Sequence, residues 1–427
     1  MLVIFVGSLL AFVILGLPIV FALGLVNLIL IEITGYPYIV LARQIIVGMN
    51  SFPLLAIPFF MFVGEIMNKG GIARRLVEFA DSLVGHITGG LGHVNILASM
   101  FFGGISGSAI ADTSAIGGLM IPPMTRQNYP APYAAAVTAA SAVIGIIIPP
   151  SIPFILFGIV TGTSISRMFL GGMIPGIIVG LALMATTYIT CRRHGYGFAE
   201  GSEPKRFSFR AVGSSFLHAA PSLTIPVIIV GGILTGVFTA TEAGAVAALV
   251  AFLLAMFYRE VRLKDLPGLL ATTARTTAIV TFLLGMAMVS AWLLTREEVP
   301  RDLALFLGSV STSPTSVMLL ATALLLVVGL VMDLTPAMLI LAPIFLPAIQ
   351  EFGIPDVYFG VIMSISLGIG LVTPPVGTVL YVATAVAGVR LERLVVAIIP
   401  FVLTLFGVLI LLLAFPPLVT WLPSLLN

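Results

Sequence analysis

The chain has 427 residues, of which 59% are hydrophobic and only 8% are charged, and its mean hydropathy is +1.21. This is more apolar surface than a soluble core can bury, so most of the chain is expected to lie in lipid. The net charge of +2 is spread over loops, which excludes a nucleic-acid-binding patch. A single cysteine, Cys191, excludes an internal disulfide. Apolar runs of about 20 residues favour helices over membrane strands, so we expect an all-α polytopic membrane protein.

In chain order, polar breaks divide the first half into a short series of apolar segments. We expect spans at 2–16, 18–34 and 50–67, a re-entrant hairpin at 93–124, a broken span at 133–161 and a span at 168–190. Apolar residues at helical spacing between Asn68 and His86 predict an amphipathic helix at the membrane surface. Glu65 lies near the end of a span, where its side chain could reach water by snorkelling. Residues 191–218 have the composition of a solvated linker.

The second half repeats this order. We expect spans at 221–237, 241–258 and 277–295, a hairpin at 316–348, a broken span at 357–387 and a last span at 394–420. Each half then has five crossings and one hairpin, and because five is odd, the second half should be inverted relative to the first. Fifteen of the 19 Lys and Arg residues fall on one side of this topology, which predicts that both termini are on the outer side.

A direct sequence repeat supports this division. Residues 329–375 match residues 104–150 at a constant offset of 225 positions, with nine identities in 47 positions that are mostly Gly and Pro. Interrupted apolar segments in corresponding halves are the best sequence indication of a transporter binding site. The predicted organisation is therefore 1–92 scaffold and arm helix, 93–161 first transport unit, 162–220 last span and linker, 221–315 second scaffold, 316–387 second transport unit and 388–427 last span.

Two kinds of helix interruption, a hairpin tip and a proline break, are expected to form the binding sites. Small and hydroxyl residues follow Gly103 at the first hairpin tip, and Pro149-Pro150 interrupts the next span, because proline lacks an amide hydrogen. Carbonyl groups released from a helix at membrane depth suit a monovalent cation such as Na⁺, while half-helix N-termini favour an anionic substrate. The polar side chains expected near the substrate are Ser106, Asp112, Thr113, Ser151, Thr335 and Thr378.

The second tip has the most prominent acid of the chain. Asp333 has no basic neighbour in sequence, and a carboxylate at that depth is costly unless it has a partner or a function. Either cation binding or capping of the following helix would account for it. Thr373 stands where the first copy has Ile148, so the two sites should not be identical.

These motifs resemble the large membrane subunit of tripartite ATP-independent periplasmic (TRAP) transporters. The resemblance rests on Gly103 to Met124, on the run from Ile146 to Ser151, and on the run from Gly370 to Gly377. It implies an elevator-type importer, not an enzyme, that uses a Na⁺ gradient to take up an organic acid such as sialic acid or a C4-dicarboxylate across the bacterial inner membrane. It also implies two partners, a small four-helix membrane subunit and a periplasmic substrate-binding protein, and at least two Na⁺ ions. By motif match the first ion site falls on Ser106, Ser108, Gly145, Ile148 and Pro150, and the second on Asp333, Gly370, Thr373 and Pro375.

Two other functions fit parts of the sequence. A stand-alone Na⁺/carboxylate symporter of the same superfamily would use the same repeat without partners. An intramembrane serine protease would use the Gly104-Ile105-Ser106-Gly107 motif, but it needs a histidine base at the same depth, and His218 is predicted at a loop edge.

Overall fold

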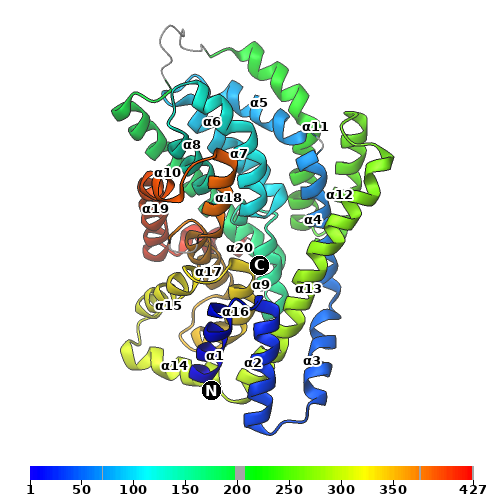
Figure 1. Cartoon of the computed structure of the whole chain (residues 1–427), viewed down its shortest axis with the longest axis vertical. Coiled ribbons are helices and arrows are strands. Elements are labelled where there is room, and N and C mark those ends of the chain that lie inside the picture. Colours follow the sequence, from blue (N-terminus) through cyan, green and yellow to red (C-terminus); the bar gives the residue numbers. More distant parts are fainter. Residues whose placement is uncertain (70, 198–206, 375–376, 426–427) are drawn as a thin grey trace.

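The computed structural model describes residues 1–69, 71–197, 207–374 and 377–425, with backbone only for residues 104–106. Every regular element in these ranges is a helix, from α1 (Leu2–Ile14) to α20 (Pro417–Ser424), as Figure 1 shows. Six segments are long and apolar enough to cross a membrane. They are η1 with α4 (Phe52–Leu55, Ala56–Lys69), α10 (Ile165–His194), α11 (Phe209–Leu234), α12 (Ala240–Phe257), η3 with α13 (Leu263–Asp265, Leu266–Arg296) and α19 (Leu391–Ala414).

The two copies seen in the sequence are also two copies in secondary structure. In the first, the hairpin is α6 (Gly90–Ser106) and α7 (Ala109–Arg126), followed by α8 (Ala131–Ala142), η2 (Val143–Ile146) and α9 (Ile152–Thr161). In the second, the hairpin is α15 (Pro314–Gly329) and α16 (Leu334–Gln350), followed by α17 (Asp356–Leu371) and α18 (Thr378–Ala387). The broken spans are interrupted at the shared positions Pro149 and Pro374, because proline lacks the amide hydrogen that a regular helix needs, whereas the shared Pro122 and Pro347 lie inside α7 and α16.

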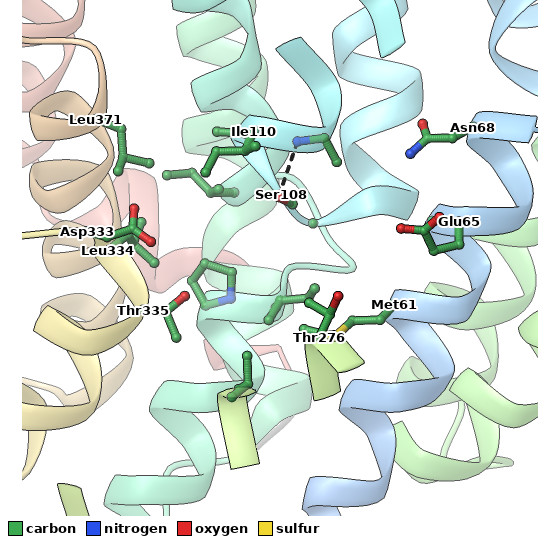
Figure 2. Close-up of a pocket in the computed structure, with 18 of the residues that line it drawn as sticks. Met61, Glu65, Asn68, Ser108, Ile110, Thr276, Asp333, Leu334, Thr335 and Leu371 are labelled. Atoms are coloured by element: carbon green, nitrogen blue, oxygen red, sulfur yellow. Dashed lines mark hydrogen bonds between the residues drawn. The ribbon is translucent and has the colours of Figure 1, made fainter. Parts of the chain in front are cut away.

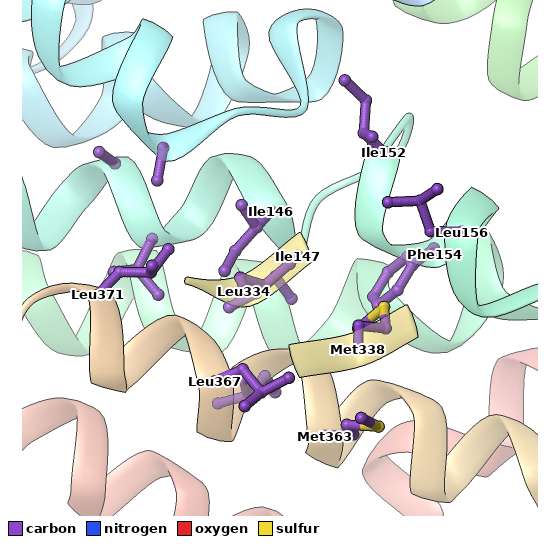
Figure 3. Packing of buried hydrophobic residues seen from close by; sticks show 14 of the residues in the cluster. Ile146, Ile147, Ile152, Phe154, Leu156, Leu334, Met338, Met363, Leu367 and Leu371 are labelled. Atoms are coloured by element: carbon purple, nitrogen blue, oxygen red, sulfur yellow. The ribbon is translucent and has the colours of Figure 1, made fainter. Parts of the chain in front are cut away.

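The two copies interlock through their broken spans. The second piece of each broken span packs on the hairpin of the other copy, with α9 against α16 and α18 against α7. Figure 1 shows α18 beside α7 towards one end of the molecule and α16 in the other half. Between them is a continuous apolar core, in which Ile147 and Phe154 of the first copy meet Leu334 and Met338 of the second (Figure 3). The hairpins and broken spans therefore form one packed unit.

Helices outside this unit form a second group. α12 packs on α4, and α13 contacts α2 (Ile19–Thr34), α3 (Ile39–Met49) and α4. A buried amide links this group at depth, since Asn27 donates to the Met286 carbonyl at 2.9 Å and accepts from the Ser290 hydroxyl at 2.7 Å. Such hydrogen bonds satisfy polar groups where no water is available. α4 and α13 also touch the first group, through α6 and α16 respectively.

Several predicted boundaries were wrong. Two helices were not predicted: α3, whose eleven residues include Arg43 and Gln44, and α14 (Val299–Val310), whose first turn contains Arg301 and Asp302. α14 is the counterpart of the amphipathic helix α5 (Ile72–Val84), which lies where the sequence predicted it. Short or charged helices escape a search for long apolar runs.

The linker and two spans also differ from the prediction. α11 begins at Phe209 and α13 at Leu266, more than ten residues before the apolar runs that predicted them, so the connector after α10 is shorter than expected. The last predicted span ends at Ala414, and Pro416 is the N-cap residue of a separate short helix, α20.

Candidate functional site

The first hairpin tip rests on the first broken span. Gly107 ends α6 with φ 60°, a left-handed conformation that favours glycine. A Cβ atom there would lie 2.8 Å from the amide nitrogen of Ile152 and 3.4 Å from the Pro150 carbonyl oxygen. Ser108 then caps α7 by accepting a hydrogen bond from the Ala111 amide at 3.4 Å. Gly107 thus lets the tip touch the break at Pro150.

Beside this contact the backbones of α6 and η2 cross at two glycines, Gly103 and Gly145, and we call such a point a glycine crossing. A Cβ atom on Gly103 would lie 2.3 Å from the Gly145 Cα, so the two backbones are as close as two glycines allow. The fully buried Asp112 lies against the same point, with its Oδ2 only 2.1 Å from a Cβ built on Gly145. Gly145 therefore leaves room for both the hairpin backbone and a carboxylate.

The second copy repeats the crossing with a different acid. A Cβ atom on Gly370 would lie 2.3 Å from the Gly329 carbonyl oxygen and 2.6 Å from its Cα. Asp333 is the N-cap residue of α16, the place that Ser108 has on α7, and its Oδ1 accepts a hydrogen bond from the Thr378 hydroxyl at 3.3 Å. Asp333 therefore joins the second tip to the helix that follows the second break.

Both tips open onto one cavity, with about 960 Å³ of empty space including the part open to the outside. The first tip contributes Ser108 and the second contributes Asp333 and Thr335, while Ile146 and Leu371 come from the two breaks. The opposite wall is formed by α4 and α13. We call it the α4–α13 wall, and its polar members are Glu65, Asn68, Thr273 and Thr276. Figure 2 shows Glu65 and Asp333 on opposite sides of the cavity, with Ser108 between them.

The charged side chains among the described residues of this cavity are all acidic. Glu65 and Asp333 are acidic, and no Lys, Arg or His is among the described residues that line it. Thr273 is only 6% exposed, and its Oγ1 has no hydrogen-bond partner. A buried polar atom without a partner is unusual and calls for an explanation. The cavity can therefore accept cations and hydrogen-bond donors, but it offers no fixed positive side chain.

The predicted site residues divide into three groups. Ser108, Asp333 and Thr335 line the cavity, and Thr378 bonds to Asp333. The second group is placed next to the tips and breaks but is not among the described lining residues: Asp112, Thr113, Gly145, Ile148, Pro150, Ser151, Gly370 and Thr373. The third group lies outside the description, namely Pro375 and the side chain of Ser106.

Three hydroxyls in the second group have local hydrogen bonds. Thr113 donates to the Ala109 carbonyl at 2.8 Å, Ser151 to the Ile146 carbonyl at 2.6 Å, and Thr373 to the Ile369 carbonyl at 2.6 Å. Their protons are committed to the backbone, although each oxygen keeps lone pairs that could face a cation.

Sequence reasoning missed the α4–α13 wall. Glu65 was explained by snorkelling, and Asn68, Thr273 and Thr276 were not considered, although all four line the cavity. The spacing of Glu65 and Asn68, and of Thr273 and Thr276, by three residues places each pair on one helix face. That signal was available, but nothing in sequence indicated that these two faces meet the hairpin tips.

The fold is similar to that of a solved transporter. A crystal structure of the YdaH transporter from Alcanivorax borkumensis matches with a TM-score of 0.63 at 15% identity, over 87% of each chain. At this identity the likeness concerns the fold alone.

The sequence comparisons are more specific. The model of the DctM component of tripartite ATP-independent periplasmic transporters matches residues 6–418, so the chain belongs to this family. It is 42% identical to the 2,3-diketo-L-gulonate TRAP transporter large permease protein YiaN of Escherichia coli, over 97% of both chains. It is 40% identical to the sialic acid TRAP transporter large permease protein SiaM of Vibrio cholerae, over 96% of this chain and 95% of that one.

A third relative is longer than this chain. The isethionate TRAP transporter permease protein DctMQ of Oleidesulfovibrio alaskensis is 37% identical over 93% of this chain, which spans 62% of its length. These matches confirm the resemblance found in the sequence. They favour neither the stand-alone symporter nor the serine protease.

Proposed function

We propose that this chain is the large permease of a TRAP transporter that imports an organic acid together with Na⁺ across the bacterial inner membrane. The names of its relatives support the class of substrate, because 2,3-diketo-L-gulonate, sialic acid and isethionate are all organic acids. The family description supports the partners, a small membrane subunit and a periplasmic substrate-binding protein. The longer DctMQ relative has room for a further membrane segment on the same chain.

One observation carries the Na⁺ coupling. Two acids and no base line the described part of the cavity where both tips meet, so an anionic substrate would be repelled from it unless cations were bound first. Bound Na⁺ would turn this repulsion into attraction. Binding of ion and substrate would then be coupled by charge alone.

The proposed ion sites lie where each tip meets its break. The first would use Ser106, Ser108 and the backbone around Gly145, Ile148 and Pro150, and the second would use Asp333 with Gly370, Thr373 and Pro375. Asp333 fits this role because its carboxylate lines the cavity at the second tip, where the Leu334 amide and, at a long 3.3 Å, the Thr378 hydroxyl donate to it. Oxygen ligands of low total charge suit a monovalent ion.

The movement we propose is an elevator. The packed unit of hairpins and broken spans would carry substrate and Na⁺ past the helices that include α4 and α13, with the second copy inverted relative to the first and both termini periplasmic. Each positive charge that crosses the full membrane gains about 2.3 kcal/mol per 100 mV. Two Na⁺ with a monocarboxylate would therefore be driven by the membrane potential as well as by the gradient.

Reconstituted uptake tests this function. Liposomes containing the chain, a candidate small subunit and a candidate binding protein should accumulate an organic acid when Na⁺ is supplied outside. Replacing Na⁺ by K⁺ at equal ionic strength should abolish accumulation. Uptake that is equal in Na⁺ and K⁺ would contradict the proposal.

A further inference from the structure

We propose that the α4–α13 wall selects an acid with a single carboxylate and a hydroxylated, uncharged remainder. This inference rests on the proposed function, because it assumes that the substrate lies in the cavity between the tips and the wall. It narrows the substrate from organic acids in general to sugar-acid-like monocarboxylates.

The first step concerns charge at the wall. Glu65 projects from α4 into the cavity from the side opposite Asp333, and no described lining residue is basic (Figure 2). Na⁺ held at the tips can neutralise a carboxylate on that side. A second carboxylate at the far end of the substrate would lie near Glu65, where like charges in a low-dielectric site repel strongly. Dicarboxylates are therefore disfavoured by the wall.

The second step concerns hydrogen bonds. The Glu65 carboxylate can accept from several hydroxyl groups, and hydrogen bonds to a charged acceptor are stronger than those between neutral groups. The Thr273 Oγ1 is buried at the wall without a partner, and a substrate hydroxyl that reached it would give it one. An alkyl chain would leave both groups unsatisfied, which costs binding energy. A hydroxylated chain would satisfy them.

The third step concerns the neighbours of Thr273. The next hydroxyl before it along α13, that of Thr272, is exposed and donates to the Gly268 carbonyl at 3.1 Å. Thr276 lines the cavity but donates to the Thr272 carbonyl at 3.1 Å. Among these three threonines only Thr273 lacks an internal partner. This makes it the sharpest probe of the wall, with Thr272 as a matched control.

Four six-carbon acids form a matched test panel. Gluconate has one carboxylate and five hydroxyls, glucarate has two carboxylates and hydroxyls, hexanoate has one carboxylate and no hydroxyl, and adipate has two carboxylates and no hydroxyl. Binding to the purified full-length chain is measured as the ligand-dependent shift of its unfolding temperature in Na⁺ and in K⁺ at pH 7.5. We expect gluconate to bind at least about tenfold more tightly than each of the other three in Na⁺.

Two substitutions separate the two parts of the wall. Glu65→Gln should raise the affinity for glucarate relative to gluconate by about fivefold or more, since it removes the opposing charge. Thr273→Val should reduce the preference for gluconate over hexanoate by about three- to tenfold, whereas Thr272→Val should leave this preference unchanged. Ratios between ligands are compared within each variant, so a general loss of stability does not imitate the effect.

The outcomes also distinguish this inference from the proposed function on which it rests. Na⁺-dependent binding with no preference among the four acids, or with ratios unchanged in both wall variants, would overturn the wall's role and leave Na⁺-coupled acid transport intact. Binding of the acids that is equal in Na⁺ and K⁺ would overturn both.

Discussion

The two copies of the hairpin and broken span share their backbone but not the side chains that hold it. In the first copy a buried polar network ties α6 to α8. Asn95 donates to the Thr138 hydroxyl at 2.7 Å and accepts from Ser141 at 3.2 Å, and Ser99 lies 3.0 Å from Ser141. All four residues are buried.

The second copy has mostly apolar residues at the equivalent places. At the offset of 225, Leu320, Leu324 and Met363 replace Asn95, Ser99 and Thr138, and only Ser366 retains a hydroxyl, which bonds within its own helix to Ile362. The acids differ too, since Asp112 is buried behind Gly145 while Asp333 lines the cavity. The comparison indicates that glycine and proline fix the shared backbone, whereas side chains are free to divide structural and binding roles between the copies.

The largest expected effect is at the glycine crossings. Gly370→Ala should prevent normal folding or destabilise the chain by about 3 kcal/mol or more, because the new Cβ meets the Gly329 backbone, which cannot turn aside. Gly145→Ala should cost less, since its closest obstacle is the Asp112 carboxylate, although Gly103 also lies near. Gly118→Ala on α7, with open space around it, is the control. Unfolding temperatures of the three purified variants give the order, and an equal cost at Gly370 and Gly118 would contradict the crossing.

The second-largest effect is expected in the polar network of the first copy. Asn95→Leu, which introduces the residue of the second copy, should destabilise the protein by about 1–3 kcal/mol because Ser141 and Thr138 lose a buried partner. Thr138→Val should then cost less in the Asn95→Leu background than in the wild type, as expected for residues of one network. Fully additive losses in thermal unfolding would show that the network does not act as a unit.

A smaller effect is expected when the charge of Asp333, which lines the cavity, is removed. Asp333→Asn keeps the side-chain size but removes the charge, and we expect the Na⁺ concentration for half-maximal uptake to rise about tenfold, equivalent to about 1.4 kcal/mol. Asp302→Asn, an exposed acid on α14, serves as the matched control. An unchanged Na⁺ response in Asp333→Asn would remove this carboxylate from the ion site.

The smallest effect concerns the matched tyrosines. The Tyr358 hydroxyl donates to the Leu412 and Leu413 carbonyls at 3.3 and 3.4 Å, whereas the Tyr133 hydroxyl lies 3.5 Å from the Cys191 thiol, a weak partner. Tyr358→Phe should therefore cost about 1 kcal/mol and Tyr133→Phe less. Thermal unfolding of both variants measures the difference, and a larger cost at Tyr133 would reverse this ranking of the copies.

The sequence predicted much of this arrangement because its clearest signals are backbone signals. Glycine and proline mark tips and breaks, and the offset of 225, which pairs Gly145 with Gly370 and Pro149 with Pro374, showed that these breaks belong to two copies. Helices without long apolar runs, such as α3 and α14, gave no comparable signal.

The site was predictable only in part, for a related reason. Ser108, Asp333 and Thr335 could be identified from their places at the tips. Glu65 and Thr273 face the same cavity from helices about 200 residues apart in sequence, and which helix face meets a distant tip depends on packing that a single sequence does not display.

The convergence of both tips on one cavity can be tested by thiol labelling. Cys191 is the only native cysteine and is buried, so Ser108→Cys and Thr335→Cys can each be introduced as the one reactive thiol, with exposed Thr125→Cys as the control. We predict that a hydrophilic maleimide labels both tip variants, and that Na⁺ with a bound acid protects both while K⁺ does not, with no effect on Thr125→Cys. Protection of one tip without the other, or labelling of both that Na⁺ and acid leave unchanged, would contradict a shared cavity for ion and substrate.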